Sequence, residues 1–258
     1  MTARAEVTLS FDKGCARIVL SNPGKRNALT WEMYEQLEAH LDELSRHENL
    51  RALVITGTAA DGFAAGTDIS QFAEFASADD GIEYERRVGR ILGKLDGLAV
   101  PTIAEVHGTA VGAGLAIAVM CDIIVADRSA RFGAPIVRTL GNCLPGAVFA
   151  RLRDRLGSAR TLSMLLTAAL VSADDLLASG FVLDSVEEDQ LHDRVETVIR
   201  GIRRSAPRSL AALKALDRRL SSGDVDDEDL LRSCYGSDDF MEGVSAFLEH
   251  RHPHWKGY

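Results

Sequence analysis

Residues 103–123, IAEVHGTAVGAGLAIAVMCDI, place closely spaced glycines directly after an apolar run. The pattern predicts a buried strand over 102–107, a tight turn at Gly108 and a small-residue helix over 113–121. That helix begins on the loop Gly112-Ala113-Gly114, so its first N–H groups lack partners within the helix and lie at the positive end of its dipole. Such an arrangement suits the stabilisation of a developing oxyanion.

Two common glycine-rich sites do not match this stretch. It lacks the Gly-Lys-Ser/Thr of a P-loop, and no G-x-G-x-x-G occurs where a Rossmann fold needs it. Taken alone, the stretch is also explained by a Gly/Ala helix that packs closely on its neighbours. The spacing nevertheless resembles the signature of the crotonase, or enoyl-CoA hydratase/isomerase, superfamily: an apolar run ending at Gly108, small residues at 112–114, and then Cys121-Asp122-Ile123.

Further segments carry this resemblance along nearly the whole chain. The loop GFAAGTDISQF at 62–72 has the form F-x-A-G-x-D-[IL]; by itself it would be interpreted as a connection with a helix-capping Asp68. NPGKRNAL at 22–29 matches the loop that meets the CoA nucleotide in the superfamily. Three more segments resemble motifs of the superfamily. Residues 132–136 are similar to F-G-x-P-E, and residues 140–146 to L-G-x-x-P-G shifted by one residue. The ending, residues 247–257, is similar to the terminal F-x-E-K-R-x-P-x-x-K-G.

The resemblance implies an acyl-CoA substrate, with CoA as part of the substrate and no separate cofactor. Members of the superfamily stabilise a thioester enolate with two backbone N–H groups, and the matching donors here are those of Thr67 and Ala113. One such donor contributes about 10²–10³ in rate. The superfamily more often has Ala and Gly at these positions, and the β-branched Thr67 is expected to narrow the pocket. The implied substrate contacts are Lys25, Arg26, Ala28, Ala65, Asp68, Ile69, Gly112 and Arg138, with Lys25 and Arg26 on the phosphates and Arg251 and Lys256 reaching across a subunit interface.

The acid–base groups of the hydratases are missing. Hydration needs one group to activate water and one to deliver a proton, and superfamily hydratases use two glutamates, in G-G-G-x-E and in F-G-x-P-E. Those positions are Ala116 and Ile136 here. Ala147 occupies a position where some isomerases keep a glutamate, and the dehalogenase-type aspartate is not evident. The sequence therefore predicts a poor hydratase with no carboxylate at the usual places.

The polar residues that remain have open alternatives. Asp68 is expected to cap its helix, whereas Arg138 either holds a substrate carboxylate or makes a surface ion pair. Cys143 is interpreted as a buried, inert thiol, because no partner for a nucleophile is evident. Glu105 and His107 alternate along one face of the core strand, where an intersubunit ion pair explains them as well as catalysis does.

Composition excludes several classes of protein. The 258 residues, 46% hydrophobic and 26% charged, are typical of a globular protein, and the net charge of −9 argues against a nucleic-acid partner. Four scattered cysteines without C-x-x-C argue against disulfides and zinc, and His250, His252 and His254 are interpreted as surface histidines, so no metal is expected. Without a membrane-length apolar run or a signal peptide, we expect a cytoplasmic protein with no membrane partner.

The order of predicted elements indicates an α/β protein. Strands are expected over 7–11, 15–20, 51–57, 123–126 and 181–186, helices over 31–46, 82–95, 147–156, 159–167 and 173–179, and a loop over 132–136. From about 189 the pattern is helical, interrupted by an acidic surface loop at 221–229. With the resemblance, the expected fold is a crotonase-like spiral of β-β-α units over residues 1–200. Residues 201–258 then form a helical C-terminal region for assembly into a homotrimer or a dimer of trimers.

Two classes of function follow. The first is an enzyme of the enoyl-CoA hydratase/isomerase group, a lyase or isomerase of fatty acid metabolism that acts through a thioester enolate with non-standard proton handling. Decarboxylation or thioester hydrolysis would need fewer carboxylates than hydration. The second is an acyl-CoA binding protein with little or no turnover.

Overall fold

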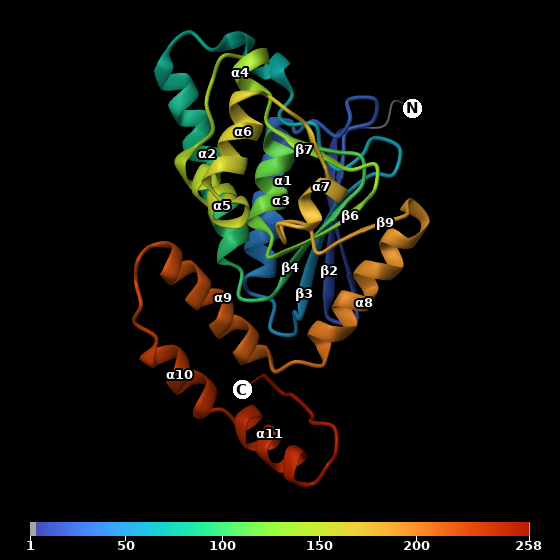
Figure 1. The fold of residues 1–258 in the computed structure, drawn as a ribbon, viewed down its shortest axis with the longest axis vertical. Coiled ribbons are helices and arrows are strands. Elements are labelled where there is room, and N and C mark those ends of the chain that lie inside the picture. The colour runs from blue at the N-terminus through green and yellow to red at the C-terminus, as the bar shows by residue number, and fades with distance from the viewer. Residues whose placement is uncertain (1–3, 258) are drawn as a thin grey trace.

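The computed structural model describes residues 4–257, which form two sheets covered by helices (Figure 1). The larger sheet has the order β1-β2-β3-β4-β6-β9, in which only β1 and β2 are antiparallel. Its strands are β1 (Glu6–Asp12), β2 (Cys15–Ser21), β3 (Ala52–Gly57), β4 (Thr102–Val106), β6 (Ile123–Asp127) and β9 (Asp184–Val186). The smaller sheet has the order β5-β7-β8, with β5 (Thr109–Val111), β7 (Arg131–Gly133) and β8 (Val171–Ser172). The expected α/β architecture is confirmed.

Helices of the first two thirds of the chain pack mainly against one face of the larger sheet. They are α1 (Trp31–Leu44), α2 (Ala78–Gly97), α3 (Ala113–Met120), α4 (Ile136–Thr139), α5 (Gly146–Leu156), α6 (Ser158–Leu166) and α7 (Ala173–Leu177), with short 3-10 turns at Ile69–Glu74 and Glu188–Gln190. The Thr30 hydroxyl caps α1 by accepting a hydrogen bond from the Met33 N–H at 3.3 Å. The apolar face of α1 is buried in the core.

The opposite face of the sheet is covered by α8 (Leu191–Arg203), which buries Leu191, Val195, Ile199 and Ile202. Alternate residues of β3 serve the two faces: Leu53 and Ile55 point into the larger core, and Ala52 and Val54 point toward α8. Because the central strands are buried on both faces, they read as continuous apolar runs in the sequence.

Several expected boundaries were wrong. Helix α2 begins at Ala78 instead of residue 82, because Ser77 and Asp80 form a capping box that adds a turn. The expected loop at 132–136 contains part of β7 and the start of α4, and β5 was not predicted. Strands β5 and β7 are three residues long and pair with each other, so no periodicity in the sequence could identify them. Of the strand expected over 181–186, only Asp184–Val186 forms a strand, β9.

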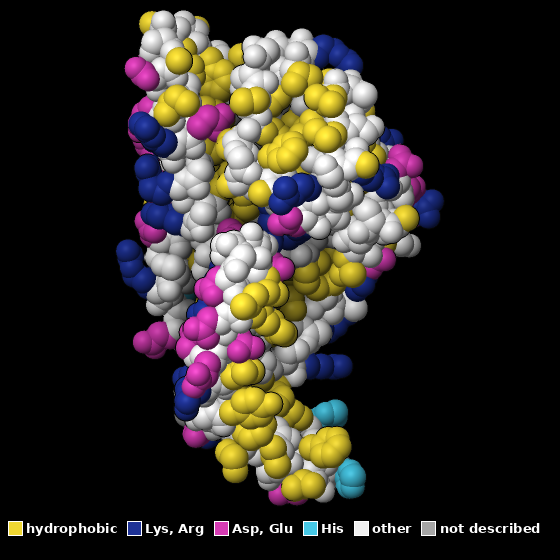
Figure 2. Space-filling model, turned by 60° about the vertical axis from the view of Figure 1, so that its left-hand side comes forward, with side chains coloured by type: hydrophobic (Ala, Val, Ile, Leu, Met, Phe, Trp, Pro, Cys, Tyr) yellow, Lys and Arg dark blue, Asp and Glu magenta, His cyan; other side chains and the backbone are white. Residues whose placement is uncertain are grey.

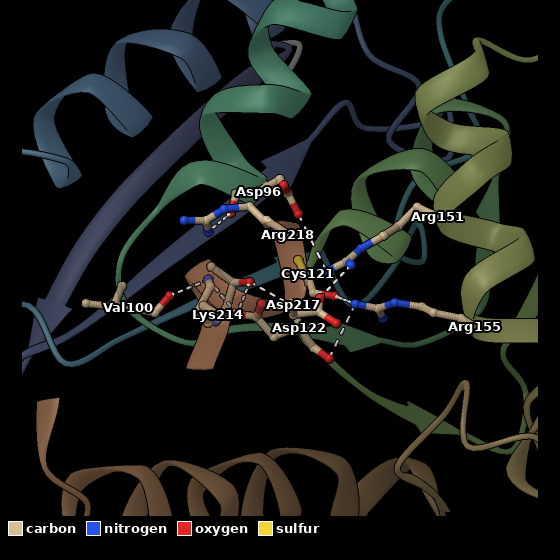
Figure 3. Close-up of polar contacts among 10 residues, drawn as sticks. Asp96, Val100, Cys121, Asp122, Arg151, Arg155, Lys214, Asp217 and Arg218 are labelled. Carbon is tan, nitrogen blue, oxygen red and sulfur yellow. Dashed lines mark hydrogen bonds and ion pairs between the residues drawn. The ribbon is translucent and has the colours of Figure 1, made fainter. Parts of the chain in front are cut away.

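Helix α9 (Pro207–Ser221) is held to the body by polar contacts (Figure 3). The Lys214 ammonium donates to the Val100 carbonyl at 2.7 Å and lies 2.6 Å from an Asp122 carboxylate oxygen. Arg218 donates to the Asp96 carbonyl at 2.8 Å, and Asp217 accepts from Arg151 at 2.7 Å. Lys214 is mostly buried, so these contacts set the position of α9 more firmly than surface ion pairs would.

Beyond α9, helices α10 (Glu228–Tyr235) and α11 (Asp238–Leu248) form an arm that extends away from the body (Figure 1). The chain then returns, and the Trp255 indole N–H donates to the Arg204 carbonyl at 2.6 Å. The arm carries a gathered apolar surface (Figure 2), in which Met241, Phe247 and Leu248 are 65%, 81% and 72% exposed. Among the described residues, no helix is both long and apolar enough to span a bilayer.

Candidate active site

The loop 62–69 and the start of α3 lie against each other through backbone hydrogen bonds to β5. The Ala64 N–H donates to the Thr109 carbonyl at 2.9 Å, and the Val111 N–H donates to the Ala64 carbonyl at 3.0 Å. The approach requires a glycine at 114, because a Cβ there would lie 2.1 Å from the Ala64 carbonyl oxygen. Gly112, with φ of 56° and ψ of −116°, makes the turn into α3, a conformation open only to glycine.

Two backbone N–H groups at this junction have no acceptor within residues 4–257. In the loop, the flanking bonds run from the Leu29 N–H to the Gly66 carbonyl at 2.8 Å and from the Asp68 N–H to the Leu29 carbonyl at 2.9 Å, which leaves the Thr67 N–H unused. At the helix start, the Ala113 N–H is likewise unused, as the geometry of a first turn dictates. A Cβ built on Gly66 would lie 3.9 Å from the Ala113 nitrogen, so the two segments are in close contact.

A cavity of about 330 Å³, here called the central cavity, opens at this junction. Its wall combines the loop 62–69, α2, α3, α4 and the beginning of α5, and most of it is apolar. Eight residues singled out in the sequence belong to the wall: Arg26, Ala65, Thr67, Ile69, Gly112, Ala113, Ala116 and Ile136. Asn142 and Cys143 also line it.

The Thr67 side chain joins two tyrosines in a cluster here called the hydroxyl triad. Its hydroxyl oxygen lies 2.7 Å from the Tyr34 phenol oxygen and 2.7 Å from the Tyr84 phenol oxygen. Tyr34 is 2% exposed, and burial raises the pKa of its phenol well above the usual value. The triad anchors the side chain of Thr67, whose backbone N–H is one of the two unused donors. From the sequence, the Thr67 side chain was expected only to narrow the pocket, and its contacts with the two tyrosines were not predicted.

Ala116 and Ile136, at the two positions where hydratases of the superfamily carry glutamates, contribute apolar side chains to the wall. A carboxylate does line the cavity, however, and the sequence reasoning missed it. Glu85 lies on α2, half-buried, and burial raises the pKa of its carboxyl group. Its spacing in the sequence could have identified it. Glu85, Val88 and Leu92 are spaced to share one face of α2, so this face carries one acidic residue among apolar ones.

Four of the expected substrate contacts lie outside the wall: Lys25, Ala28, Asp68 and Arg138. Asp68 caps the 3-10 turn as expected, accepting from the Ser70 N–H at 3.1 Å; hydrogen bonding by the Ser70 hydroxyl lowers the pKa of its carboxyl group. Arg138 forms no ion pair with another described residue, and its guanidinium donates to the Thr167 carbonyl at 2.5 Å.

Within one chain, Glu105 is buried and forms an ion pair with Arg17, and it lines none of the central cavity. His107 lies with Nε2 3.0 Å from the Thr58 carbonyl oxygen. The expected burial of Cys143 was wrong, because its side chain is exposed and lines the central cavity. Burial instead raises the pKa of Cys15 to about 11 and that of Cys121 to about 12.

Near the C-terminus, Arg251 is occupied within its own chain. Its guanidinium nitrogens lie 2.6 and 2.9 Å from the carboxylate oxygens of Glu242 and 2.7 Å from Glu249. These contacts reduce its availability to a neighbouring subunit. No group of three or more His, Cys, Asp or Glu side chains in the described part of the chain is arranged to hold a metal ion.

Comparison with known proteins agrees with this geometry. A model of the family described as enoyl-CoA hydratase/isomerase matches residues 10–258. The chain belongs to this family. It is 33% identical over 253 residues to a probable enoyl-CoA hydratase of Mycobacterium tuberculosis, with 96% of each chain covered. It is 31% identical over 259 residues to the 2,3-dehydroadipyl-CoA hydratase of Escherichia coli, covering 98% of this chain and 99% of the relative.

The fold matches as well. The crystal structure of an enoyl-CoA hydratase/carnithine racemase from Magnetospirillum magneticum superposes with a TM-score of 0.91 at 28% identity, covering 98% of this chain and 96% of that one. The expected crotonase-like fold is therefore confirmed, and so is the superfamily resemblance.

Proposed function

We propose that this protein acts on an acyl-CoA thioester bound in the central cavity and stabilises the thioester enolate with the N–H groups of Thr67 and Ala113. One observation carries the proposal: two unused backbone donors, from a loop and from a helix start in close contact, adjoin an apolar cavity. Membership of the enoyl-CoA hydratase/isomerase family supports the substrate class.

The chemistry follows from the position of the donors. When a proton leaves the carbon next to the thioester carbonyl, negative charge moves to the carbonyl oxygen. Backbone N–H groups are already oriented and need no reorganisation as the charge develops, so each contributes about 10²–10³ in rate. The dipole of α3 adds to the effect at its N-terminal end, where Ala113 lies.

Hydration is expected to be slow. Ala116 and Ile136 can neither activate water nor deliver a proton, and each missing acid–base group typically costs about 10²–10⁴ in rate. The same apolar side chains avoid the desolvation cost of two buried carboxylates. We therefore assign the protein to the hydratase/isomerase group with proton handling that differs from that of a two-glutamate hydratase.

The proposal also covers the CoA part of the substrate and the assembly of the subunits. Arg26 at the cavity wall and Lys25 beside it in sequence would contact the CoA phosphates. The exposed apolar surface of α11 supports assembly through the arm, as a homotrimer or a dimer of trimers. In such an assembly Lys256 would contact a neighbouring subunit. The proposed setting is the cytoplasm.

Thiol protection and calorimetry test the proposal together. Cys143 is exposed and lines the central cavity, so a chromogenic disulfide reagent should modify it, and saturating hexanoyl-CoA should slow that modification at least about 10-fold. Titration calorimetry should show saturable binding of the same ligand. A panel of acyl-CoAs followed by mass spectrometry then separates turnover from binding alone. No heat and no protection at millimolar ligand would overturn the proposal.

A further inference from the structure

The wall of the central cavity contains one carboxyl group, that of Glu85, among the residues that the structure describes. The other titratable groups of the wall are Arg26, Tyr84 and Cys143. Ala116 and Ile136, at the two positions aligned with the hydratase glutamates, supply no carboxylate. An enolate, however, cannot form unless some base accepts the proton from the substrate. Among the described residues of the wall, Glu85 is therefore the carboxyl group that could accept this proton.

Glu85 lines the same cavity as Thr67 and Ala113, whose N–H groups are the proposed oxyanion donors. Glu85 directly follows Tyr84, whose phenol oxygen lies 2.7 Å from the Thr67 hydroxyl oxygen. Burial is the main cause that raises the pKa of the Tyr84 phenol, and the charge of Glu85 adds to the rise. The carboxylate and the Thr67 N–H thus belong to neighbouring parts of one wall.

No cation neutralises Glu85 within the described residues. The arginines of its own helix are directed to other acids: Arg86 lies 3.8 Å from Glu83, Arg87 2.7 Å from Glu35 and Arg90 3.2 Å from Glu38. On the facing segments of the wall, Cys143 and Arg26 are the titratable groups, and neither forms a hydrogen bond or ion pair with Glu85. Burial alone raises the pKa of the Glu85 carboxyl group, which brings it closer to the range in which a carboxylate works well as a base near neutral pH.

We propose that Glu85 is the acid–base catalyst of this protein and that it moves a proton along a 3-enoyl-CoA, shifting the double bond to the 2-position. The inference rests on the proposed function. The Glu85 carboxylate takes a proton from C2, and the electrons of that C–H bond form the dienolate, whose oxygen accepts hydrogen bonds from the Thr67 and Ala113 N–H groups. The dienolate then takes the same proton from Glu85 at C4, and a C2–C3 double bond remains.

The reaction balances without water, an oxidant or a metal. One carboxylate suffices because it is first base and then acid, whereas hydration needs an activated water and a separate proton delivery. The apolar side chains of Ala116 and Ile136 suit this assignment, since a wall that attracts little water limits competing protonation of the dienolate by water. The substrate class is therefore a straight-chain enoyl thioester with its double bond one carbon beyond conjugation.

The test compares Glu85→Gln with Glu83→Gln in the full-length protein. Glu83 lies on the same helix, is 71% exposed and lines none of the cavity, so its substitution makes the same charge change away from the site. Isomerisation of 3-hexenoyl-CoA and 3-dodecenoyl-CoA is followed by the absorbance of the conjugated product, and binding of hexanoyl-CoA by calorimetry. For Glu85→Gln, kcat should fall at least about 10²-fold while the Kd stays within about 2-fold. Glu83→Gln should change neither.

The pH profile separates catalysis from a structural role. Wild-type kcat should rise with pH through an ionisation above the ordinary glutamate range, because the base must be deprotonated. Glu85→Asp should keep that rise at a reduced rate, and Glu85→Gln should lose it. Equal rates for wild type and Glu85→Gln, or a wild type that binds hexanoyl-CoA but isomerises neither substrate, would overturn the inference and leave the proposed binding site standing. A wild type that binds no acyl-CoA would overturn both.

Discussion

Replacing Thr67 by Val removes the central hydroxyl of the triad and keeps the branched shape of the side chain. The Thr67 hydroxyl lies 2.7 Å from the phenol oxygens of both Tyr34 and Tyr84. Tyr84 lines the central cavity, where water can replace the lost contact, but Tyr34 is almost completely buried. We therefore expect the loss of stability to come mainly from Tyr34.

The magnitude follows from the two lost hydrogen bonds. Each contributes about 0.5–1.5 kcal/mol net, and leaving a buried donor unsatisfied costs about 1–3 kcal/mol. The expected decrease in the free energy of unfolding is thus about 1–3 kcal/mol, and for a chain of this size each kcal/mol lowers the Tm by roughly 2–4 °C. In a Tyr34→Phe background no buried phenol is left unsatisfied, so the same Thr67→Val change should cost less by about 1 kcal/mol.

The assay is urea denaturation of the four proteins of this double-mutant cycle, followed by circular dichroism at one protein concentration, because association would make stability depend on concentration. A second cycle with Tyr84→Phe is the matched control. Its coupling with Thr67→Val should be weaker, since Tyr84 reaches the cavity. If Thr67→Val costs less than about 0.5 kcal/mol, or if the Tyr34 cycle is additive, the hydroxyl triad does not stabilise the loop and our reasoning is wrong.

Four further predictions follow from the structure. Gly114→Ala should lower stability by about 1–3 kcal/mol and acyl-CoA turnover at least about 10-fold, because the new Cβ would lie 2.1 Å from the Ala64 carbonyl oxygen; Gly93→Ala, with open space on α2, should stabilise by about 0.5–1 kcal/mol instead. Phe247→Asp should reduce the mass measured by light scattering, because it places a charge in the apolar surface of α11, and an unchanged mass would show that assembly does not use this surface. Ala116→Glu with Ile136→Glu, once shown to be folded and to bind hexanoyl-CoA, should raise hydration of crotonyl-CoA by about 10²-fold or more; no gain would mean that the pocket differs in shape as well as in chemistry. Burial raises the pKa of Glu85 in the folded protein above its unfolded value, so the native state binds the proton more tightly and loses stability as pH rises through that pKa. The Tm of Glu85→Gln relative to wild type should therefore increase between about pH 4 and pH 8, and a constant difference would contradict the burial of this carboxyl group.

Local chemistry made much of this protein predictable from its sequence. Met33, Leu37 and Leu41 recur at helical spacing after Thr30, which indicates the helix α1, and the apolar runs of β3 and β4 indicate buried strands. The glycine at 112 needs a positive φ, and the helix after it must leave its first N–H groups free. The expected oxyanion donors follow from these rules and from the resemblance to the superfamily. The absence of glutamates at 116 and 136 is likewise a property of the sequence alone.

Only the tertiary structure decided which side chains share the central cavity. Glu85 and Thr67 are separated by 18 positions, and no spacing rule relates a helix to a loop that folds against it; Tyr84 makes the connection through a hydroxyl. The same holds for Glu105, whose partner Arg17 comes from a strand two places away in the sheet. Long-range packing determines these neighbours, because burial and desolvation depend on everything that surrounds a group. Residue type and spacing predict how a segment folds, and the assembled wall determines which carboxyl group is positioned to move a proton.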